Sequence, residues 1–472
     1  MSKLKGFLSR VTPKNSFIKN VVTLVCGTVG AQLIALLASP FLTRMYSPDD
    51  FGLLALFASS LAIGLIITTL RYDLAIPLPK SDKHAENILG LSVLLHFISI
   101  IVLLMVTYLF QDIIVAKLDV SGSIWILWLF PAGLFFAGLY SILTQWTVRK
   151  KKFSKITITR FIQVFVTLLI QFSGAVYGGI SLVIGQLFGQ GAGVGTLARP
   201  NLKRITVEGM LNAFRHYKRF PKYSMPAGLF RVAGTELPVL FLALSFSSSS
   251  AGLYALTMKV LSAPASLIGS AIGQVFISDA PKAHREGRLD ILVERLSFKL
   301  IHIGAPAALI VILLGPQLFS VVFGERWSEA GEYASWLSLW IYLVFISSPL
   351  STLTTVLEKQ KQGLYFHAVM FFLRVAALYY GLITSSVMMA IIALSCVNTL
   401  GRLFFICWLY KISGNKVSSF LFENIKAMCF SALCIVPLML TLYFQPHLWF
   451  TGLFISSLVI GLRYLRLLKE AF

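Results

Sequence analysis

Residues 87–110 read NILGLSVLLHFISIIVLLMVTYLF, a run of 24 positions that contains no Asp, Glu, Lys or Arg. Each residue of an α-helix adds about 1.5 Å, so this run forms a helix about 36 Å long. The hydrocarbon core of a bilayer is about 30 Å thick, and a helix of roughly 20 apolar residues crosses it. The run therefore predicts a transmembrane helix.

Similar apolar runs recur along the chain of 472 residues, which is 57% hydrophobic and only 13% charged. Soluble proteins carry about 25% charged residues. Because so few charges cannot cover a water-facing surface of this size, lipid must cover most of it. We expect an all-α, polytopic membrane protein with about 14 transmembrane helices. They are placed at residues 19–43, 51–70, 87–110, 123–147, 156–177, 179–198, 224–246, 251–277, 297–323, 334–357, 364–383, 387–410, 425–444 and 448–462.

Basic residues outnumber acidic ones in the chain, with 41 Lys and Arg against 19 Asp and Glu, a net charge of +22. If the N-terminus is cytoplasmic and the spans alternate, the inside segments and the adjoining span ends hold 33 of these basic residues. The outside segments hold only Arg44, Lys117 and Arg326. This segregation is typical of bacterial inner-membrane proteins, whose cytoplasmic loops are basic. It predicts an even number of spans with both termini in the cytoplasm, and it explains the charge without a nucleic-acid partner.

The loops offer little to a catalytic or metal-dependent function. The longest outside loop, residues 111–122, leaves no room for an extramembrane catalytic domain, and no cysteine has metal-ligand spacing with histidine. Gly185, Gly189 and Gly193 lack the lysine of a phosphate-binding loop and indicate close helix packing instead. We therefore expect no catalytic residue, no metal and no cofactor. The largest inside loop, residues 199–222, is basic with interleaved apolar residues and predicts an amphipathic helix on the membrane surface.

Two segments 200 residues apart resemble each other. Residues 47–56 read SPDDFGLLAL and residues 247–256 read SSSSAGLYAL, and each joins two predicted spans on the outside. Six spans separate the copies, so the halves run parallel around an axis along the membrane normal, as in some transporters. We predict an N-terminal lobe at 1–198, the basic linker at 199–222, a C-terminal lobe at 223–410 and two further helices at 411–472.

Two stretches near the N-terminus resemble a known family. Residues 40–52, PFLTRMYSPDDFG, and residues 70–81, LRYDLAIPLPKS, look like the opening of Wzx-type polysaccharide flippases of the multidrug/oligosaccharidyl-lipid/polysaccharide exporter superfamily. The resemblance implies transport of undecaprenyl-pyrophosphate-linked oligosaccharide from the cytoplasmic to the periplasmic leaflet for O-antigen or exopolysaccharide synthesis. It implies the lipid-linked substrate as a partner, together with the polymerase and chain-length regulator of such a pathway.

Ionisable residues within the predicted spans mark the candidate site. A basic residue at the bilayer centre costs roughly 2.5–3.5 kcal/mol, so these side chains are expected to face a wet cavity or a partner. Excess positive charge suits an anionic substrate, and guanidinium groups bind phosphate in a forked geometry. The candidate substrate-binding bases are Arg231, Lys259, Arg374, Arg402 and Arg160. Arg160 lies near the cytoplasmic end of its span, where a long side chain often reaches the interface instead.

Glu236 is the single acid within the predicted spans. It is a candidate coupling-ion site for a proton or Na⁺, and a structural pair with a buried base is the alternative. The sequence leaves the sugar, the coupled ion and the oligomeric state open.

Three other functions remain as alternatives. A multidrug exporter for cations would need buried acids, and the chain supplies one. A membrane glycosyltransferase or polymerase could use Asp49 and Asp50, but Ser47-Pro48-Asp49-Asp50 is also the pattern of a helix start. A structural scaffold would not need buried bases. We therefore expect an alternating-access transporter rather than an enzyme.

Overall fold

The computed structural model describes residues 16–118, 126–445 and 448–470, and within them the regular structure is helical, without strands. The chain divides into two units, Met1–Ala255 and Leu256–Phe472, and the boundary lies inside the long helix α11 (Ser248–Arg285). This division does not test the predicted lobe boundaries, which stay a prediction.

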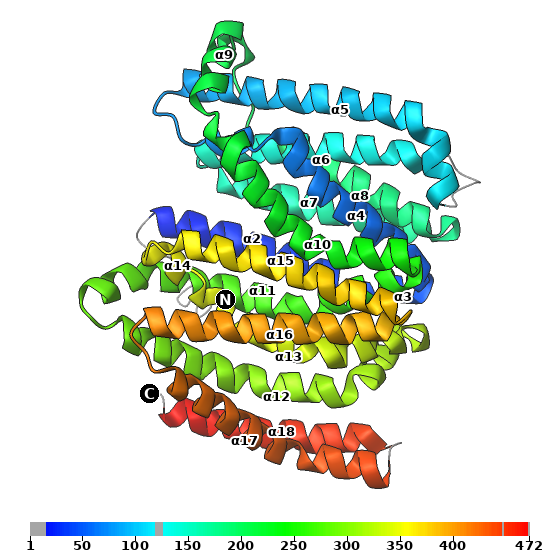
Figure 1. Ribbon diagram of the computed structural model, residues 1–472, viewed down its shortest axis with the longest axis vertical. Helices are drawn as coiled ribbons and strands as arrows, with labels where there is room; N and C mark the ends of the chain where they lie inside the picture. The colour runs from blue at the N-terminus through cyan, green and yellow to red at the C-terminus, as the bar shows by residue number, and fades with distance from the viewer. Residues whose placement is uncertain (1–15, 119–125, 446–447, 471–472) are drawn as a thin grey trace, which may run out of the picture. The chain divides into compact units, whose positions relative to one another are not determined.

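Unit 1 is built from long helices joined by short turns (Figure 1). Its helices are α2 (Ser16–Leu37), α3 (Ser39–Met45), α4 (Pro48–Thr69), α5 (Asp82–Leu118), α6 (Ile126–Arg149), α7 (Phe153–Ser173), α8 (Gly179–Ala192), α9 (Val207–His216), α10 (Met225–Ser245) and the start of α11. Short 3₁₀ turns lie at Tyr72–Ala75, Ala175–Tyr177, Val194–Thr196 and Leu202–Arg204, and a π-helical turn at Phe220–Ser224 precedes α10.

Unit 2 continues with α11 and the helices that follow it. These are α12 (Leu289–Phe323), α13 (Ser328–Leu350), α14 (Leu353–Val356), α15 (Gln360–Ile383), α16 (Val387–Ile412), α17 (Val417–Phe444) and α18 (Trp449–Glu470), with a 3₁₀ turn at Glu325–Trp327. Helix α13 packs against both α12 and α16, and α17 pairs with α18.

Eleven helices in the described part of the chain are long and apolar enough to cross a membrane, so the chain is a multi-pass membrane protein. Every predicted span overlaps a helix, but the span predicted at 334–357 passes from α13 into α14, and α8, α11 and α18 are outside this set of eleven. Helix α8 has only 14 residues. The count of 14 spans therefore stays a prediction.

The first predicted span differs from the structure in one respect. The helix is interrupted at the single residue Ala38, between α2 and α3, because Pro40 has no backbone N–H to bond to the preceding turn. Ala38 keeps a helical backbone, and residues 27–45 still form one candidate span.

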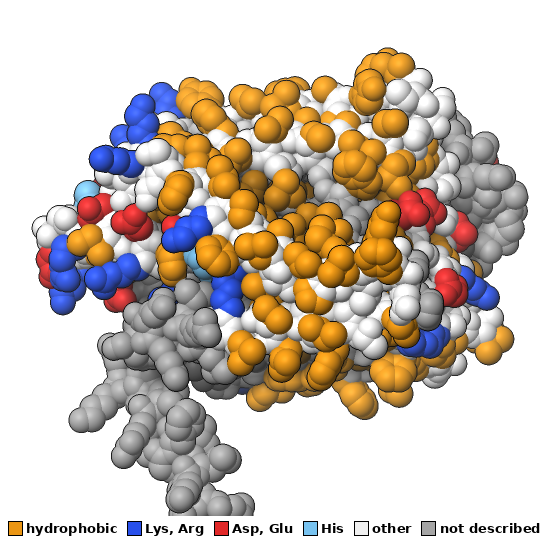
Figure 2. Space-filling view, turned by 90° about the horizontal axis from the view of Figure 1, so that it is seen from below, with side chains coloured by type: hydrophobic (Ala, Val, Ile, Leu, Met, Phe, Trp, Pro, Cys, Tyr) orange, Lys and Arg blue, Asp and Glu red, His pale blue; other side chains and the backbone are white. Residues whose placement is uncertain are grey.

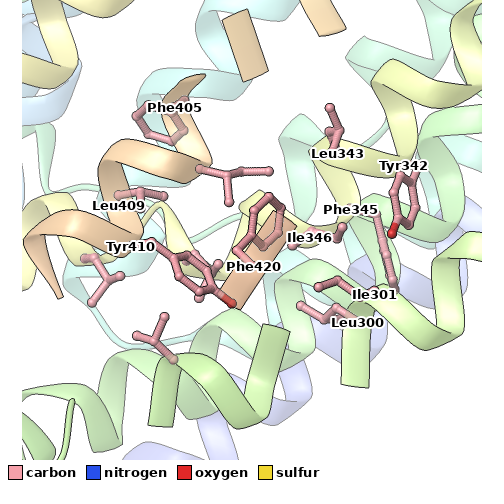
Figure 3. Packing of buried hydrophobic residues seen from close by; sticks show 14 of the residues in the cluster. Leu300, Ile301, Tyr342, Leu343, Phe345, Ile346, Phe405, Leu409, Tyr410 and Phe420 are labelled. Atoms are coloured by element: carbon pink, nitrogen blue, oxygen red, sulfur yellow. The ribbon is translucent and has the colours of Figure 1, made fainter. Parts of the chain in front are cut away.

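Apolar side chains are distributed as a membrane protein requires. In unit 2, Leu300 and Ile301 of α12 belong to one buried core with Tyr342 and Ile346 of α13, which Phe405 of α16 extends (Figure 3). On the outer face seen in Figure 2, hydrophobic side chains cover the middle and most Lys and Arg lie toward one edge. This exposed apolar surface is the part of the molecule that lipid would cover.

The two similar segments start their helices in the same way. Helices α4 and α11 begin at positions 48 and 248, and the hydroxyls of Ser47 and Ser247 accept hydrogen bonds from the N–H groups three residues later, at 3.2 and 3.1 Å. The two helix starts also touch reciprocally. A Cβ at Gly52 would strike the backbone of Ser248, and a Cβ at Gly252 would strike the backbone of Pro48. The structure thus relates the two segments by a local two-fold correspondence.

Helix packing explains the glycine repeat of the sixth predicted span. A Cβ at Gly185 or Gly189 would meet the backbone of α7, at the carbonyls of Thr167 and Gln163 respectively. The glycines allow α8 to approach α7 closely, as predicted.

Candidate functional site

Helix α10 carries two of the predicted site residues, Arg231 and Glu236. Five residues separate them, which places them about 140° apart around the helix. The Arg231 side chain is exposed, whereas Glu236 is half-buried. The hydroxyl of Ser59 on α4 donates a hydrogen bond of 2.8 Å to the Glu236 carboxylate, and Ser59 itself is buried. Glu236 is therefore held between two helices of unit 1 by a neutral donor.

The structure adds a base that the sequence analysis assigned to a loop. The guanidinium of Arg71 lies against α10 at Gly228, where an added Cβ would come within 3.0 Å of its Nε and Nη2 atoms. Gly228 is three residues before Arg231, so the two bases lie near the same end of α10 and repel each other. Within the part of the chain that the structure describes, the buried Nε of Arg71 has no hydrogen-bond partner.

A strained turn holds Arg71 in this position. Leu70 and Arg71 both have left-handed backbones, with φ of 46° and 60°. This conformation is unfavourable for residues other than glycine, by roughly 1–2 kcal/mol each. Tyr72 and Asp73, which follow, are almost completely buried, and the hydroxyl of Ser141 donates to Asp73 at 3.2 Å. Packing of these neighbours fixes the turn, a combination often found at functional sites.

Burial also sets the protonation chemistry of this turn, which lies outside the spanning helices. Burial lowers the pKa of Arg71, Asp73 opposes the shift and Arg231 adds to it. Burial raises the pKa of the Asp73 carboxyl, an effect that Arg71 and the Ser141 hydroxyl oppose. Arg71 nevertheless stays cationic, because guanidinium groups do not deprotonate in proteins.

In unit 2 the structure brings together two of the predicted bases on neighbouring helices. Arg374 of α15 donates from Nε to the side-chain oxygen of Asn398 on α16 at 2.8 Å. Arg402, one turn further along α16, feels the charge of Arg374 and lies over the ring of Phe405, 5.7 Å from its centre. The Nδ2 donor of Asn398 is buried and lacks a hydrogen-bond partner among the described residues.

Lys259 and Arg160 stand apart from these pairs. Lys259 lies on α11 in unit 2 and is exposed, and no ion pair with a described acid forms. Arg160 of α7 lies over the ring of Tyr140, 5.3 Å from its centre. This cation–π contact provides a structural role for Arg160 within unit 1.

The acid pair at the first outside turn serves as a helix start. The Asp50 carboxylate accepts from the backbone N–H and hydroxyl of Ser47, both at 2.8 Å, and from the N–H of Gly179 at 2.6 Å. Ser47 and Asp50 form a capping box, and Pro48 occupies the first turn. The helix-start interpretation of this sequence is confirmed.

Two sets of donors result, one in each unit: Arg71 with Arg231, and Arg374 and Arg402 with Asn398. Each combines neighbouring guanidinium groups with a buried N–H that has no described partner. Paired guanidinium groups are suited to phosphate, because they offer several charged N–H groups in a planar fork. Carboxylates of described residues form no metal-binding group of three or more ligands with His or Cys.

The sequence matches the protein family described as "Polysaccharide biosynthesis protein" over residues 41–332. No curated protein matches it. Its fold is similar to that of "Lipid II flippase MurJ, inward closed conformation", with a TM-score of 0.77 and 14% identity, over 95% of this chain and 99% of that chain.

Two other solved structures are less similar. A MATE transporter from Vibrio cholerae has a TM-score of 0.54 at 13% identity, over 84% of this chain and 95% of that one. A MOP superfamily transporter from Pyrococcus furiosus has a TM-score of 0.53 at 11% identity, over 84% and 96%. The fold of the chain is therefore that of the MOP superfamily transporters, and its match over residues 41–332 shows that it belongs to the polysaccharide biosynthesis protein family.

Proposed function

We propose that this chain is a flippase that moves undecaprenyl-pyrophosphate-linked oligosaccharide from the cytoplasmic to the periplasmic leaflet of the bacterial inner membrane. Alternating access is the mechanism, both termini are cytoplasmic, and the product supplies O-antigen or exopolysaccharide synthesis. The polymerase and chain-length regulator of such a pathway are its expected partners. Membership of the polysaccharide biosynthesis family and a fold similar to that of a lipid II flippase support this proposal.

One observation carries the choice of an anionic substrate. Arg71 and Arg231 bring two like charges to one end of α10, and the Arg71 Nε is buried without a described partner. Like charges that neighbour each other repel, and an anion bound between them relieves that repulsion. A pyrophosphate group supplies that anion and accepts hydrogen bonds from both guanidinium forks.

The second set of donors extends the same chemistry to unit 2. Arg374 and Arg402 are the proposed ligands there, with the free Nδ2 of Asn398 as a neutral donor. Lys259 is proposed as a further base that attracts the headgroup. Arg160 is the weakest of the predicted ligands, because it lies over the Tyr140 ring and belongs to neither set of donors.

Flipping in proteoliposomes tests this proposal directly. A fluorescent undecaprenyl-pyrophosphate oligosaccharide in the inner leaflet becomes reducible by external dithionite only after it is flipped. Arg71→Gln and Arg231→Gln should each slow flipping about tenfold or more, because a hydrogen bond to a charged group contributes about 1.5–3 kcal/mol. Arg→Lys variants should be intermediate, since lysine keeps the charge but loses the fork.

Lys152→Gln is the matched control, because it removes one exposed base from the same unit. Unchanged flipping in both arginine variants, with folded protein by gel filtration, would rule out these ligands. A multidrug exporter predicts a different result: efflux of cationic dyes by the wild type, which increases when Arg71 or Arg231 is neutralised.

Glu236 is proposed as the site of the coupling ion. The Ser59 hydroxyl donates to its carboxylate and no described base forms an ion pair with it, which leaves the carboxylate available to a proton or Na⁺. Glu236→Gln should abolish the dependence of flipping on an imposed pH or Na⁺ gradient. Ser59→Ala should shift that dependence without removing it. A gradient response that survives in Glu236→Gln excludes this site.

A further inference from the structure

A second basic site lies in unit 1, away from Arg71 and Arg231. A cavity of about 850 Å³ opens between the start of α5 and the helix α9. The turn before α5 and its first residues contribute Lys80, Lys83 and His84 to the lining, and α9 contributes Arg215 and His216. Among the described residues that line it, Glu208 is the one acid. None of these side chains has a role in the function proposed above.

The walls of this cavity are fixed by hydrogen bonds and close packing. Asn87 is buried; its side-chain oxygen accepts from the N–H of Thr206 at 2.8 Å, and its Nδ2 donates to the carbonyl of Lys83 at 2.9 Å. A Cβ at Gly209 would strike the Asn87 side chain, so α9 rests directly on α5.

The far end of α9 is also anchored. The hydroxyl of Tyr72 donates to the carbonyl of Phe214 at 3.2 Å, and their rings stack with centres 6.0 Å apart. Helix α9 is thus held at both ends. The cavity is a built feature of unit 1 rather than a space beside a loose loop.

The positive charge of the cavity is not neutralised by its surroundings. Asp82 is next to Lys83 in the sequence, but its carboxylate forms ion pairs with Arg149, the last residue of α6, and with Lys150, at 3.0 and 2.5 Å. Glu208 stands in the first turn of α9, where the helix dipole favours a carboxylate. The charges of Lys80, Lys83 and Arg215 therefore outweigh that of Glu208.

The outer face of α9 places this cavity near the lipid headgroups. Val207, Leu211 and Phe214 follow a spacing of four and three residues, share one face of the helix and are exposed. Helix α9 packs on α5 around residues 87–90, and the exposed apolar run of α5 begins one turn later, at Leu94. An amphipathic helix in this position rests its apolar face on the membrane and its basic face beside the headgroups.

We propose that this cavity binds a phosphate group, as a site separate from the bases on α10, α15 and α16. Two lysines supply point charges and Arg215 supplies a planar fork, the combination that proteins use for phosphate. The phosphate belongs either to an anionic phospholipid of the adjoining leaflet or to a soluble phosphorylated compound. The two sources share one chemistry, and the experiment separates them.

Hydrogen–deuterium exchange of the full chain in an uncharged detergent measures protection of the peptides that line this cavity. Pyrophosphate, compared with chloride at equal ionic strength, should slow exchange in peptides that cover residues 80–88 and 206–217. The variant Lys80→Gln/Lys83→Gln/Arg215→Gln should raise the pyrophosphate concentration needed for half-protection about tenfold or more. The matched control Lys203→Gln/Lys218→Gln/Arg219→Gln removes three bases from the same region that do not line the cavity, and it should leave protection nearly unchanged.

Arg231→Gln should also retain this protection, because the cavity is independent of the flippase site. Dioctanoyl-phosphatidylglycerol that protects the same peptides better than pyrophosphate identifies the lipid as the source, and the reverse order identifies a soluble compound. Dioctanoyl-phosphatidylcholine is the zwitterionic control. Equal losses in the two triple variants, or no protection by either phosphate probe, would overturn the proposal.

Discussion

Asp73 is a buried acid whose surroundings change its protonation. It lies two residues after Arg71, is 2% exposed, and accepts a hydrogen bond from the Ser141 hydroxyl on α6. One of its carboxylate oxygens, Oδ1, is buried without a hydrogen-bond partner in the described chain. Such a group destabilises the folded state when it is ionised, because burial removes the water that would otherwise solvate its charge.

The stability of the protein should therefore depend on pH through Asp73. Burial raises the pKa of this carboxyl in the folded state, so its contribution to stability is fully present below the ordinary Asp pKa of about 3.9. That contribution is lost as the pH rises through the folded-state pKa. As the pH rises from about 3.9 through the folded-state pKa, thermal unfolding in detergent should show Asp73→Asn becoming more stable than the wild type. Above the folded-state pKa, the difference in stability between the two proteins should stay constant.

Ser141→Ala sharpens this test. The Ser141 hydroxyl lowers the pKa of Asp73, so its removal should extend the pH-dependent window to higher pH. A difference between Asp73→Asn and the wild type that stays the same at every pH would contradict the assignment.

Arg71 shows where residue-level prediction from sequence fails. It follows an apolar run by one position, so the alternation of spans and loops assigns it to a cytoplasmic loop. Its position against Gly228 depends on two consecutive left-handed residues, and neither Leu70 nor Arg71 is a residue type that indicates such a turn. By contrast, the sequence identifies Arg374 and Arg402 as side chains that need a contact, because a charged residue inside an apolar run has to find a partner. Their part in substrate binding stays a prediction.

At the scale of helices, the matching starts of α4 and α11 make a paired prediction. Ser47→Ala and Ser247→Ala each remove a side-chain acceptor for the N–H three residues later. Each should lower the free energy of unfolding by about 1 kcal/mol, the usual effect of losing an N-cap. Ser47→Ala should have the larger effect, because the Ser47 hydroxyl also donates to the Asp50 carboxylate at 2.8 Å, whereas the Ser247 hydroxyl forms a weaker, neutral hydrogen bond with the Ser250 hydroxyl at 2.9 Å. Denaturant titration of the two variants measures the difference, and equal values would show that the capping box adds nothing.

The reciprocal glycine contacts lead to a second prediction. Gly52→Ala and Gly252→Ala each place a methyl group against the backbone of the opposite helix start, which cannot move aside as a flexible side chain can. Overpacking of this kind costs about 1–3 kcal/mol. We expect both variants to unfold at lower temperature and to flip substrate more slowly, because α4 and α11 can no longer meet.

Gly363→Ala is the matched control for this contact. Gly363 lies in α15 with open space around its Cα, so the added methyl should be neutral or favour the helix. If Gly52→Ala and Gly363→Ala behave alike in both assays, close contact at the helix starts is unimportant.

Helix types were easier to predict than helix ends. Long apolar runs located every helix that corresponds to a predicted span, and Ser47-Pro48 marked the start of α4 correctly. The break at Ala38 and the short α8 were not predicted, because the apolar composition continues through both. Composition reports burial in lipid, whereas a proline or a tight turn interrupts a helix without changing composition.

For the molecule as a whole, the sequence predicts the orientation in the membrane more strongly than any other property. The geometry of the helices alone does not determine this orientation. Hydropathy locates spans, and only the distribution of Lys and Arg gives them a direction. With 33 basic residues in the segments and adjoining span ends assigned inside and three in the segments assigned outside, an inverted molecule would place nearly all loop bases on the wrong side.

Cysteine labelling in intact cells tests this orientation. In a variant without the five native cysteines, single cysteines replace Asn201 and Glu358 on the predicted inside and Glu325 and Ser385 on the predicted outside. A membrane-impermeant maleimide should label positions 325 and 385 in intact cells, and positions 201 and 358 only after permeabilisation. Because the four positions are distributed over both units, one missed span would invert the labels beyond it and leave the earlier ones unchanged. Such a split pattern would disprove the even number of spans, and with it the cytoplasmic C-terminus that the proposed direction of transport assumes.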